Sequence, residues 1–203
     1  MSEAKIRLFV ALELPSAVRA ALRALASRLR PAAGGGVRWT DPDGIHLTLK
    51  FIGEIETARL DAVRAALAGV HAAQPVEVLF RGVGWFPNAR HPRVFWAGVE
   101  EDARRGALAA LAAEVERALE PAGIAPESRE FRPHLTLGRI KPEAHVEGLR
   151  REAERLGTPE FGRADYAEFD LMQSTLRPQG ALYTRLERFA FASPSAGSSG
   201  AAA

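Results

Sequence analysis

The sequence predicts an α+β protein with two lobes, and three observations support this fold class. A chain of 203 residues is long enough for one domain, or for two small domains that are closely joined. Hydrophobic residues make up 47% and charged residues 26%, a balance that is typical of globular proteins and excludes disorder of the whole chain. Strand-like and helix-like segments alternate, and one order of elements occurs twice. This repeat predicts a duplicated half, with two lobes around a pseudo-two-fold axis.

The first half begins with a strand and a helix. The apolar, partly β-branched run over residues 6–12 predicts a buried strand that ends before Pro15. Apolar residues then recur at intervals of three and four, which is the pattern of one helix face, and Ser16 is the expected N-cap. Pro31 and the glycines at 34–36 end this helix and predict a loop. The stripe of this helix is Val18, Leu22, Leu25 and Leu29.

A second strand, a second helix and a pair of strands follow. Alternation and β-branching over residues 45–52 predict the strand, and a new apolar stripe predicts the helix. Residues 76–86 and 94–99 predict two strands joined by a turn that contains proline and asparagine. The stripe of the second helix is Leu60, Val63, Leu67 and Val70.

The same order recurs in the second half. A third helix, a strand over residues 134–140 and a fourth helix are followed by strands over 166–172 and 182–191, with Pro178 and Gly180 in the turn between them. The two helical stripes are Leu108, Leu111, Val115 and Leu119, and Val146, Leu149, Ala153 and Leu156. We therefore expect residues 1–192 to form a single bilobal domain, and the low-complexity residues 193–203 to form a disordered tail.

Composition excludes several classes of protein. The 27 basic and 25 acidic residues leave a net charge of +2, which excludes a chain that holds nucleic acid through bulk charge. There is no cysteine, so disulfides, thiolate metal sites and cysteine nucleophiles are excluded, and a reducing cytoplasm is expected. No apolar run approaches the roughly 18 residues that span a bilayer. Arg7 and Glu13 interrupt the first apolar stretch, which therefore predicts a strand rather than a signal peptide.

The tetrapeptide His-Leu-Thr-Leu occurs once in each half. Because successive side chains of a strand point to opposite faces, His46 and Thr48 share one face, and the two leucines share the other. His134 and Thr136 are related in the same way in the second copy. Two halves related by a two-fold axis would bring both polar pairs to opposite sides of one cleft.

Two facing imidazoles suit the cleavage of a phosphodiester without a metal. One imidazole takes a proton from the attacking water, and the other protonates the departing sugar oxygen, each across roughly 2.6–3.2 Å. The hydroxyls of Thr48 and Thr136 could donate to the non-bridging oxygens, whose charge must be stabilised in the transition state. Arg139 could add a charge-assisted contact to the same phosphate.

Other interpretations compete with this one. A single His-x-Thr strand is usually structural, and paired histidines could instead bind a metal, although neither copy has an Asp, a Glu or a third His at suitable spacing. The remaining histidines, His71, His91 and His145, are expected at the surface. Of the aromatic residues, at most one or two are expected to stack on a base, and the candidates are Trp39, Trp85, Trp96, Phe9 and Tyr183.

Four segments together resemble a known family, the 2H phosphoesterases, and within it the RNA 2′,3′-cyclic phosphodiesterases, also described as LigT- or ThpR-like 2′-5′ RNA ligases. The resemblance covers nearly the whole chain, and paired His-x-Thr motifs with these flanks are specific to the family. The segments are residues 7–15, 37–54, 131–139 and 174–186.

The resemblance implies a bilobal fold of two mainly antiparallel sheets, with helices on the outside and a central cleft. It implies hydrolysis of 2′,3′-cyclic phosphate ends of RNA to 2′-phosphates, with reversible 2′-5′ joining in some members, and it implies no metal and no cofactor. By analogy His46 is the proton donor and His134 the proton acceptor, and Thr48, Thr136 and Arg139 contact the phosphate. Phe9 is a candidate for base stacking. The expected partner is an RNA end, and a monomer away from membranes is expected.

Two other functions stay open at this stage. One is a 2H enzyme that acts on a small cyclic nucleotide phosphate. The other is an RNA-binding module that holds a terminal phosphate without cleaving it. Turnover of a mononucleotide far faster than of an RNA oligomer would favour the first, and tight binding without product would favour the second.

Overall fold

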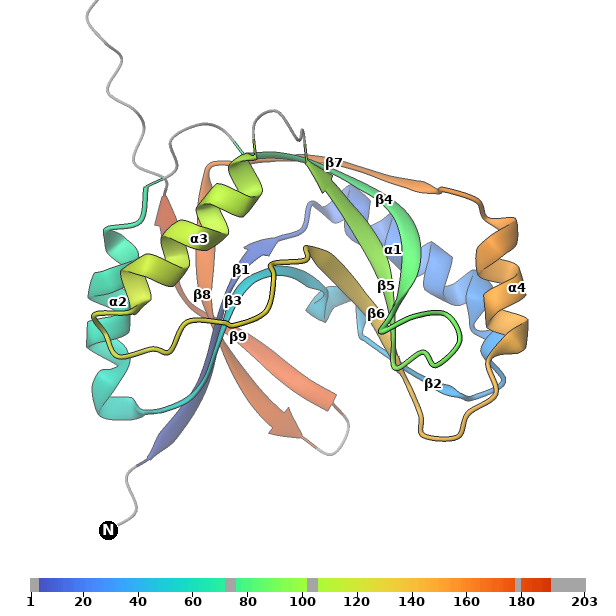
Figure 1. The fold of residues 1–203 in the computed structure, drawn as a ribbon, viewed down its shortest axis with the longest axis horizontal. Helices are drawn as coiled ribbons and strands as arrows, with labels where there is room; N and C mark the ends of the chain where they lie inside the picture. The colour runs from blue at the N-terminus through green and yellow to red at the C-terminus, as the bar shows by residue number, and fades with distance from the viewer. Residues whose placement is uncertain (1–3, 72–75, 102–105, 178–179, 191–203) are drawn as a thin grey trace, which may run out of the picture.

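A computed structural model describes residues 4–71, 76–101, 106–177 and 180–190. Two antiparallel sheets with helices against them form the structure, which confirms the predicted fold class (Figure 1). Within the described ranges, no helix is long and apolar enough to cross a membrane. The predicted tail over 193–203 and residue 191 of the last predicted strand lie outside these ranges.

The helices and strands follow the predicted order with two additions. The strands are β1 (Lys5–Glu13), β2 (Val37–Trp39), β3 (His46–Glu56), β4 (Val76–Phe86), β5 (Val94–Glu101), β6 (His134–Ile140), β7 (Glu160–Tyr166), β8 (Glu168–Arg177) and β9 (Gly180–Ala190). The α-helices are α1 (Ser16–Leu29), α2 (Leu60–Ala68), α3 (Ala107–Leu119) and α4 (Glu147–Arg155). The sequence did not predict β2 or β7, and the strand expected over 166–172 lies instead at β8.

Each sheet has helices against one side. The first sheet has the strand order β3-β1-β8-β9, and α2 and α3 lie beside it (Figure 1). The second sheet has the order β2-β6-β5-β4-β7, and α1 and α4 lie beside it. All pairings between strands are antiparallel.

The lobes do not coincide with the halves of the sequence. The repeat suggested that each half folds into its own lobe, but β1 pairs with both β3 and β8, so the first lobe takes β8 and β9 from the end of the chain. In return the two strands that end the first half, β4 and β5, join the second lobe, where β4 lies between β5 and β7. Helix α3 packs on β3 and helix α1 on β7, so the helices are exchanged as well. The two halves are therefore interleaved, and neither lobe can form without the other half.

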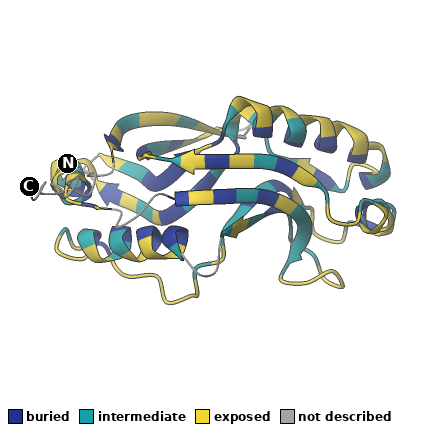
Figure 2. Cartoon of the chain, turned by 90° about the horizontal axis from the view of Figure 1, so that it is seen from above, coloured by how far each residue is buried: buried dark blue, intermediate teal, exposed yellow. Residues whose placement is uncertain are grey.

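The apolar stripes of the helices form the core together with the inner faces of the sheets. Figure 2 shows helices with buried residues on one side and exposed residues on the other. The stripe of α1 is buried throughout, as is that of α3. Ser16 is not the N-cap of α1, because the helix begins at Ser16 itself and Pro15 occupies the capping position without a side-chain hydrogen bond.

Candidate active site

A β-bulge in β3 decides which side chains face the interior between the lobes. Val10 pairs with Lys50 and Ala11 pairs with Thr48, so Leu49 is an extra residue without a partner in β1. The alternation of side chains therefore changes phase after Thr48. Leu49 and Lys50 are both buried, and Phe51 returns to the face that carries the motif.

The second motif strand contains the same irregularity at the same place. In the pairing of β5 with β6, Phe95 lies opposite Gly138 and Trp96 opposite Thr136, which leaves Leu137 as the extra residue. Arg139 therefore points to the same face as Thr136, although strict alternation would place it on the opposite face. The repeated bulge explains how an arginine three positions after the threonine reaches the site.

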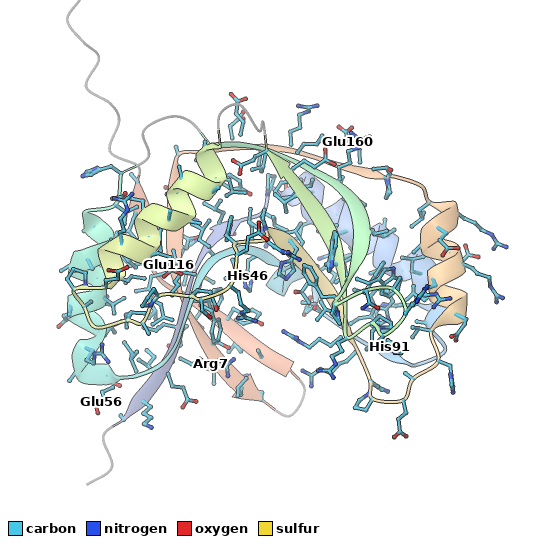
Figure 3. The ribbon with its side chains drawn as sticks, in the orientation of Figure 1. Arg7, His46, Glu56, His91, Glu116 and Glu160 are labelled. Atoms are coloured by element: carbon cyan, nitrogen blue, oxygen red, sulfur yellow. The ribbon has the colours of Figure 1, made fainter. Side chains whose placement is uncertain are left out.

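One cavity collects the predicted residues from both sheets. It has a volume of about 380 Å³, and we refer to it as the central cavity. In Figure 3, His46 lies near the middle of the molecule. Every predicted site residue lines this cavity, namely Phe9, His46, Thr48, His134, Thr136 and Arg139. Tyr183, one of the aromatic residues considered for base stacking, also lines the cavity. The polar and aromatic lining residues that were not predicted are Arg7, Arg38, Thr40, Phe51 and Ser174.

The His46 imidazole is held by one hydrogen bond and two aromatic rings. Its Nδ1 lies 2.9 Å from the carbonyl oxygen of Gly44, two residues earlier in the chain. The Phe9 ring stacks on it with 4.4 Å between centroids, and the Tyr183 ring meets it edge-on at 4.9 Å. Because a carbonyl can only accept, Nδ1 carries the hydrogen and Nε2 is left to exchange a proton.

The His134 imidazole is fixed in the same manner. Its Nδ1 lies 2.8 Å from the carbonyl oxygen of Arg132, again two residues earlier, and the Phe86 ring meets it edge-on at 4.9 Å. The same tautomer follows, with Nε2 free to exchange a proton. Both histidines therefore offer equivalent nitrogens to the central cavity.

Burial shifts both imidazoles towards the neutral form. Burial lowers the pKa of His46 to about 4, and the Gly44 carbonyl opposes this shift only in part. Burial also lowers the pKa of His134; the Arg132 carbonyl opposes this shift, and the positive charge of Arg139 adds to it. Both rings are therefore neutral near pH 7 when the cavity holds no anion. A bound phosphate would raise both pKa values by favouring the charged imidazolium.

Three arginines give the central cavity a positive wall. Arg38 of β2 and Arg139 of β6 are direct cross-strand partners, and neither has a carboxylate partner among the described residues. Arg7 lies with its guanidinium 4.8 Å from the centre of the Phe51 ring, and its buried Nε has no hydrogen-bond partner within the described part of the chain. Like charges opposite each other are destabilising in a sheet, and a bound anion would offset that cost. The wall is therefore suited to a phosphate.

The structure does not support base stacking by Phe9. Only 1% of its surface is exposed, and one face of its ring is covered by the His46 imidazole. A base could not reach that face without displacing the histidine. Phe9 instead supports His46, whereas Phe51 lines the same cavity with 47% of its surface exposed.

Local sequence patterns could have revealed some of the unpredicted residues. Arg7 lies two positions before Phe9 on β1 and therefore shares its face. Arg38 and Thr40 come from β2 and the residue after it, and Ser174 and Tyr183 are partners in the pairing of β8 with β9. Arg38, Thr40 and Ser174 reach the cavity through pairings that are distant in sequence, so no local pattern identifies them.

The other histidines lie away from the site. The side chains of His71, His91 and His145 are exposed and do not line the central cavity. Across the part of the chain that the structure describes, no three side chains of His, Cys, Asp or Glu are grouped as metal ligands would be.

A bilobal fold with two His-x-Thr strands that face one cavity is the architecture of a two-histidine phosphoesterase. The chain belongs to the LigT-like phosphoesterase family, whose model matches residues 12–96 and again residues 99–183. The two matches also confirm the predicted duplication. A curated relative from Archaeoglobus fulgidus, named RNA 2′,3′-cyclic phosphodiesterase, is 34% identical over 185 residues, which cover 91% of this chain and 99% of the relative. A Thermus thermophilus protein with the same name is 36% identical and covers 91% of this chain and 89% of its own length.

Solved structures show the same arrangement of elements. The protein TT0787 of Thermus thermophilus superposes with a TM-score of 0.73 at 33% identity, and the match covers 92% of this chain and 98% of that protein. E. coli LigT in complex with phosphate superposes with a TM-score of 0.69 at 26% identity, and the match covers 94% of this chain and 99% of LigT.

Proposed function

We propose that the protein hydrolyses 2′,3′-cyclic phosphate ends of RNA to 2′-phosphates, with His46 as general acid and His134 as general base. The observation that carries this proposal is that two equivalent strands bring two imidazoles to one cavity, each fixed through Nδ1 with Nε2 left free. The names of the curated relatives and the phosphate in the E. coli LigT complex support the substrate class.

Each histidine has one proton to move in this reaction. Nε2 of His134 takes a proton from a water molecule, whose oxygen attacks phosphorus. The bond from phosphorus to the 3′ oxygen breaks, and the imidazolium of His46 gives its Nε2 proton to that oxygen. The products are a 2′-phosphate and a 3′-hydroxyl. The assignment of donor and acceptor follows the family resemblance, because the two sites are nearly symmetric.

The remaining polar residues would stabilise the charge on phosphorus. The hydroxyls of Thr48 and Thr136 lie on the same face as the imidazoles and can donate to the non-bridging oxygens. Arg139, with Arg38 beside it, can add charge-assisted hydrogen bonds. If a 5′-hydroxyl replaces water as the attacking group, the same proton transfers give a 2′-5′ linkage, so the geometry also suits joining.

The product isomer tests the proposed reaction. An oligoribonucleotide with a 2′,3′-cyclic phosphate end is incubated with the pure protein, with and without EDTA, and the product is identified. We expect a 2′-phosphate at the same rate in both samples. A 3′-phosphate product, or activity that EDTA removes and zinc restores, would contradict the mechanism. Tight binding without product would instead support the RNA-end-binding alternative.

The pH dependence of kcat/KM follows from the buried imidazoles. The reactive form has His46 protonated and His134 neutral, so kcat/KM falls when the pH lies above both pKa values and when it lies below both. Because burial holds both pKa values below the ordinary 6.5, we expect a bell with its optimum below pH 6.5 in kcat/KM. The optimum of kcat should lie higher, since bound phosphate stabilises the imidazolium. An optimum of kcat/KM above pH 7 in steady-state assays would contradict this account.

One chain supplies the whole central cavity, including both imidazoles. We therefore propose that the monomer is the active form. The absence of cysteine is the separate reason for which we propose the cytoplasm as its compartment.

A further inference from the structure

A second cavity lies directly beside the central cavity and shares a wall with it. Its volume is about 640 Å³. Arg38, Arg139 and Tyr183 line both cavities, so a chain that leaves the central cavity at this wall enters the second one. The residues that line only the second cavity include Arg30, Trp39, Arg177 and Leu182.

The second cavity is rich in unpaired positive charge. Arg30, Arg38 and Arg177 have no carboxylate partner among the described residues, whereas many surface arginines do, such as Arg23, which lies 2.6 Å from Asp43. Asp41 supplies the one carboxylate among the described lining residues, and its Oδ1 accepts a hydrogen bond from the backbone N–H of Asp43. Together with Arg139, these arginines bring four guanidinium groups to a cavity that has one carboxylate among its described lining residues. Such an excess suits an anion in the cavity.

Apolar surface lies beside this charge. Among the described residues, three large hydrophobic side chains are exposed, and all three line one of the two cavities. Phe51 and Leu176 line the central cavity, and Leu182 lines the second, with 42% of its surface exposed. Trp39 also lines the second cavity, where the Arg30 guanidinium lies 5.6 Å from the centre of its ring. Exposed apolar side chains beside arginines suit a nucleobase with its phosphate.

We propose that the second cavity binds the nucleotide on the 5′ side of the cyclic phosphate end, and we call it the upstream-nucleotide site. The phosphate of this nucleotide contacts Arg38 and Arg177, and its base packs on Trp39 and Leu182. The inference rests on the proposed function, because it takes the cyclic phosphate to lie in the central cavity. It makes an RNA end of at least two nucleotides, rather than a mononucleotide, the preferred substrate.

A comparison of substrate lengths tests this site. We measure kcat/KM for a mononucleotide and a dinucleotide that each end in a 2′,3′-cyclic phosphate, with the wild type and the double variant Arg30→Gln/Arg177→Gln. The wild type should prefer the dinucleotide by about tenfold or more, since a charge-assisted hydrogen bond contributes roughly 1.5–3 kcal/mol. The double variant should lose most of this preference, through a lower kcat/KM for the dinucleotide.

The matched control removes the same charge elsewhere. Arg28 and Arg163 are exposed and line neither cavity, so Arg28→Gln/Arg163→Gln should keep the preference for the dinucleotide. A second measurement is the salt dependence of kcat/KM for the dinucleotide. The slope of log kcat/KM against log salt should become shallower by about 0.7, the value of one phosphate contact, in Arg30→Gln/Arg177→Gln and should not change in the control. Equal kcat/KM for both substrates in the wild type, or equal losses in the two double variants, would overturn the proposal.

A binding measurement separates this proposal from the proposed reaction. Fluorescence anisotropy with labelled mono- and dinucleotides that end in a 2′-phosphate needs no turnover. If neither cyclic substrate is hydrolysed, the proposed function fails, and the upstream-nucleotide site still predicts about tenfold tighter binding of the dinucleotide. Equal affinities for the two probes would overturn the proposed upstream-nucleotide site, whatever the outcome of the hydrolysis assay.

Discussion

Replacement of either cavity imidazole by alanine, in His46→Ala or His134→Ala, is expected to lower kcat for a 2′,3′-cyclic phosphate by roughly 10²–10⁴-fold, the usual contribution of a general acid or base. Each variant removes one of the two Nε2 atoms that face the cavity, and no other histidine among the described residues lines it. Steady-state kinetics at the pH optimum of the wild type would measure the loss.

His91→Ala is the control for this prediction. His91 is exposed and lies outside the central cavity, so its replacement should leave kcat unchanged. His46 also packs against Phe9 and Tyr183, so thermal unfolding of each variant should accompany the kinetics. If a folded variant of either cavity histidine kept near-normal hydrolysis, the proposed roles would be wrong.

Removal of the carboxylate that faces Lys50 is expected to cause the largest loss of stability. Lys50 is 5% exposed, and its Nζ lies 2.7 Å from Glu116 of α3 and 2.9 Å from the carbonyl oxygen of Ala125. Figure 3 labels Glu116. Glu116→Leu would remove the carboxylate bonded to this buried ammonium group and leave only the more distant charge of Glu127 to face it, at a cost of about 3 kcal/mol, or about 6–12 °C in Tm. Calorimetry or circular dichroism would measure the shift.

Two further variants make this prediction specific. Glu114 lies on the same helix with a similar exposure, but it pairs with the exposed Arg117, so Glu114→Leu should change the free energy of unfolding by at most about 1 kcal/mol. The double variant Lys50→Met/Glu116→Leu removes both charges and should recover most of the lost stability. Equal destabilisation by Glu116→Leu and Glu114→Leu would show that the buried pair does not stabilise the fold.

The sequence predicted the elements that have a clear hydrophobic period. All four helices were predicted from apolar stripes, and β1, β3 and β6 from short apolar or alternating runs. Strand β2 was missed because it has only three residues after a run of glycines. Strand β7 was missed because its pairing with β4 is irregular near Gly162, so Phe161 and Ala164 are buried without a period of two.

The exchange of strands between the lobes could not be predicted from the repeat. Two similar halves can each fold alone or can exchange elements, and the order of elements is the same in both cases. The choice depends on pairings such as Leu8 with Gln173, which join opposite ends of the chain. Ser174 and Tyr183 reach the central cavity only because of this exchange.

Arg139 was predicted as a site residue, but its position could not be derived from alternation. Without the bulge at Leu137, Gly138 would face the cavity and Arg139 would point away from it. The prediction came from the family resemblance and from the proximity of Arg139 to the motif, while the structure supplies the physical reason. Phe9 is the opposite case, because its place beside the motif was correct but its face is already covered by His46.

Substitution of sulfur for the bridging 3′ oxygen tests most directly whether the two imidazoles act as acid and base on one phosphorus atom. A thiolate leaves without a proton, so a substrate with sulfur at this position does not need the acid. With this substrate, His46→Ala should return to within about tenfold of the wild type, and His134→Ala should stay roughly 10²–10⁴-fold slower. Equal rescue of both variants, or rescue of His134→Ala alone, would contradict the account.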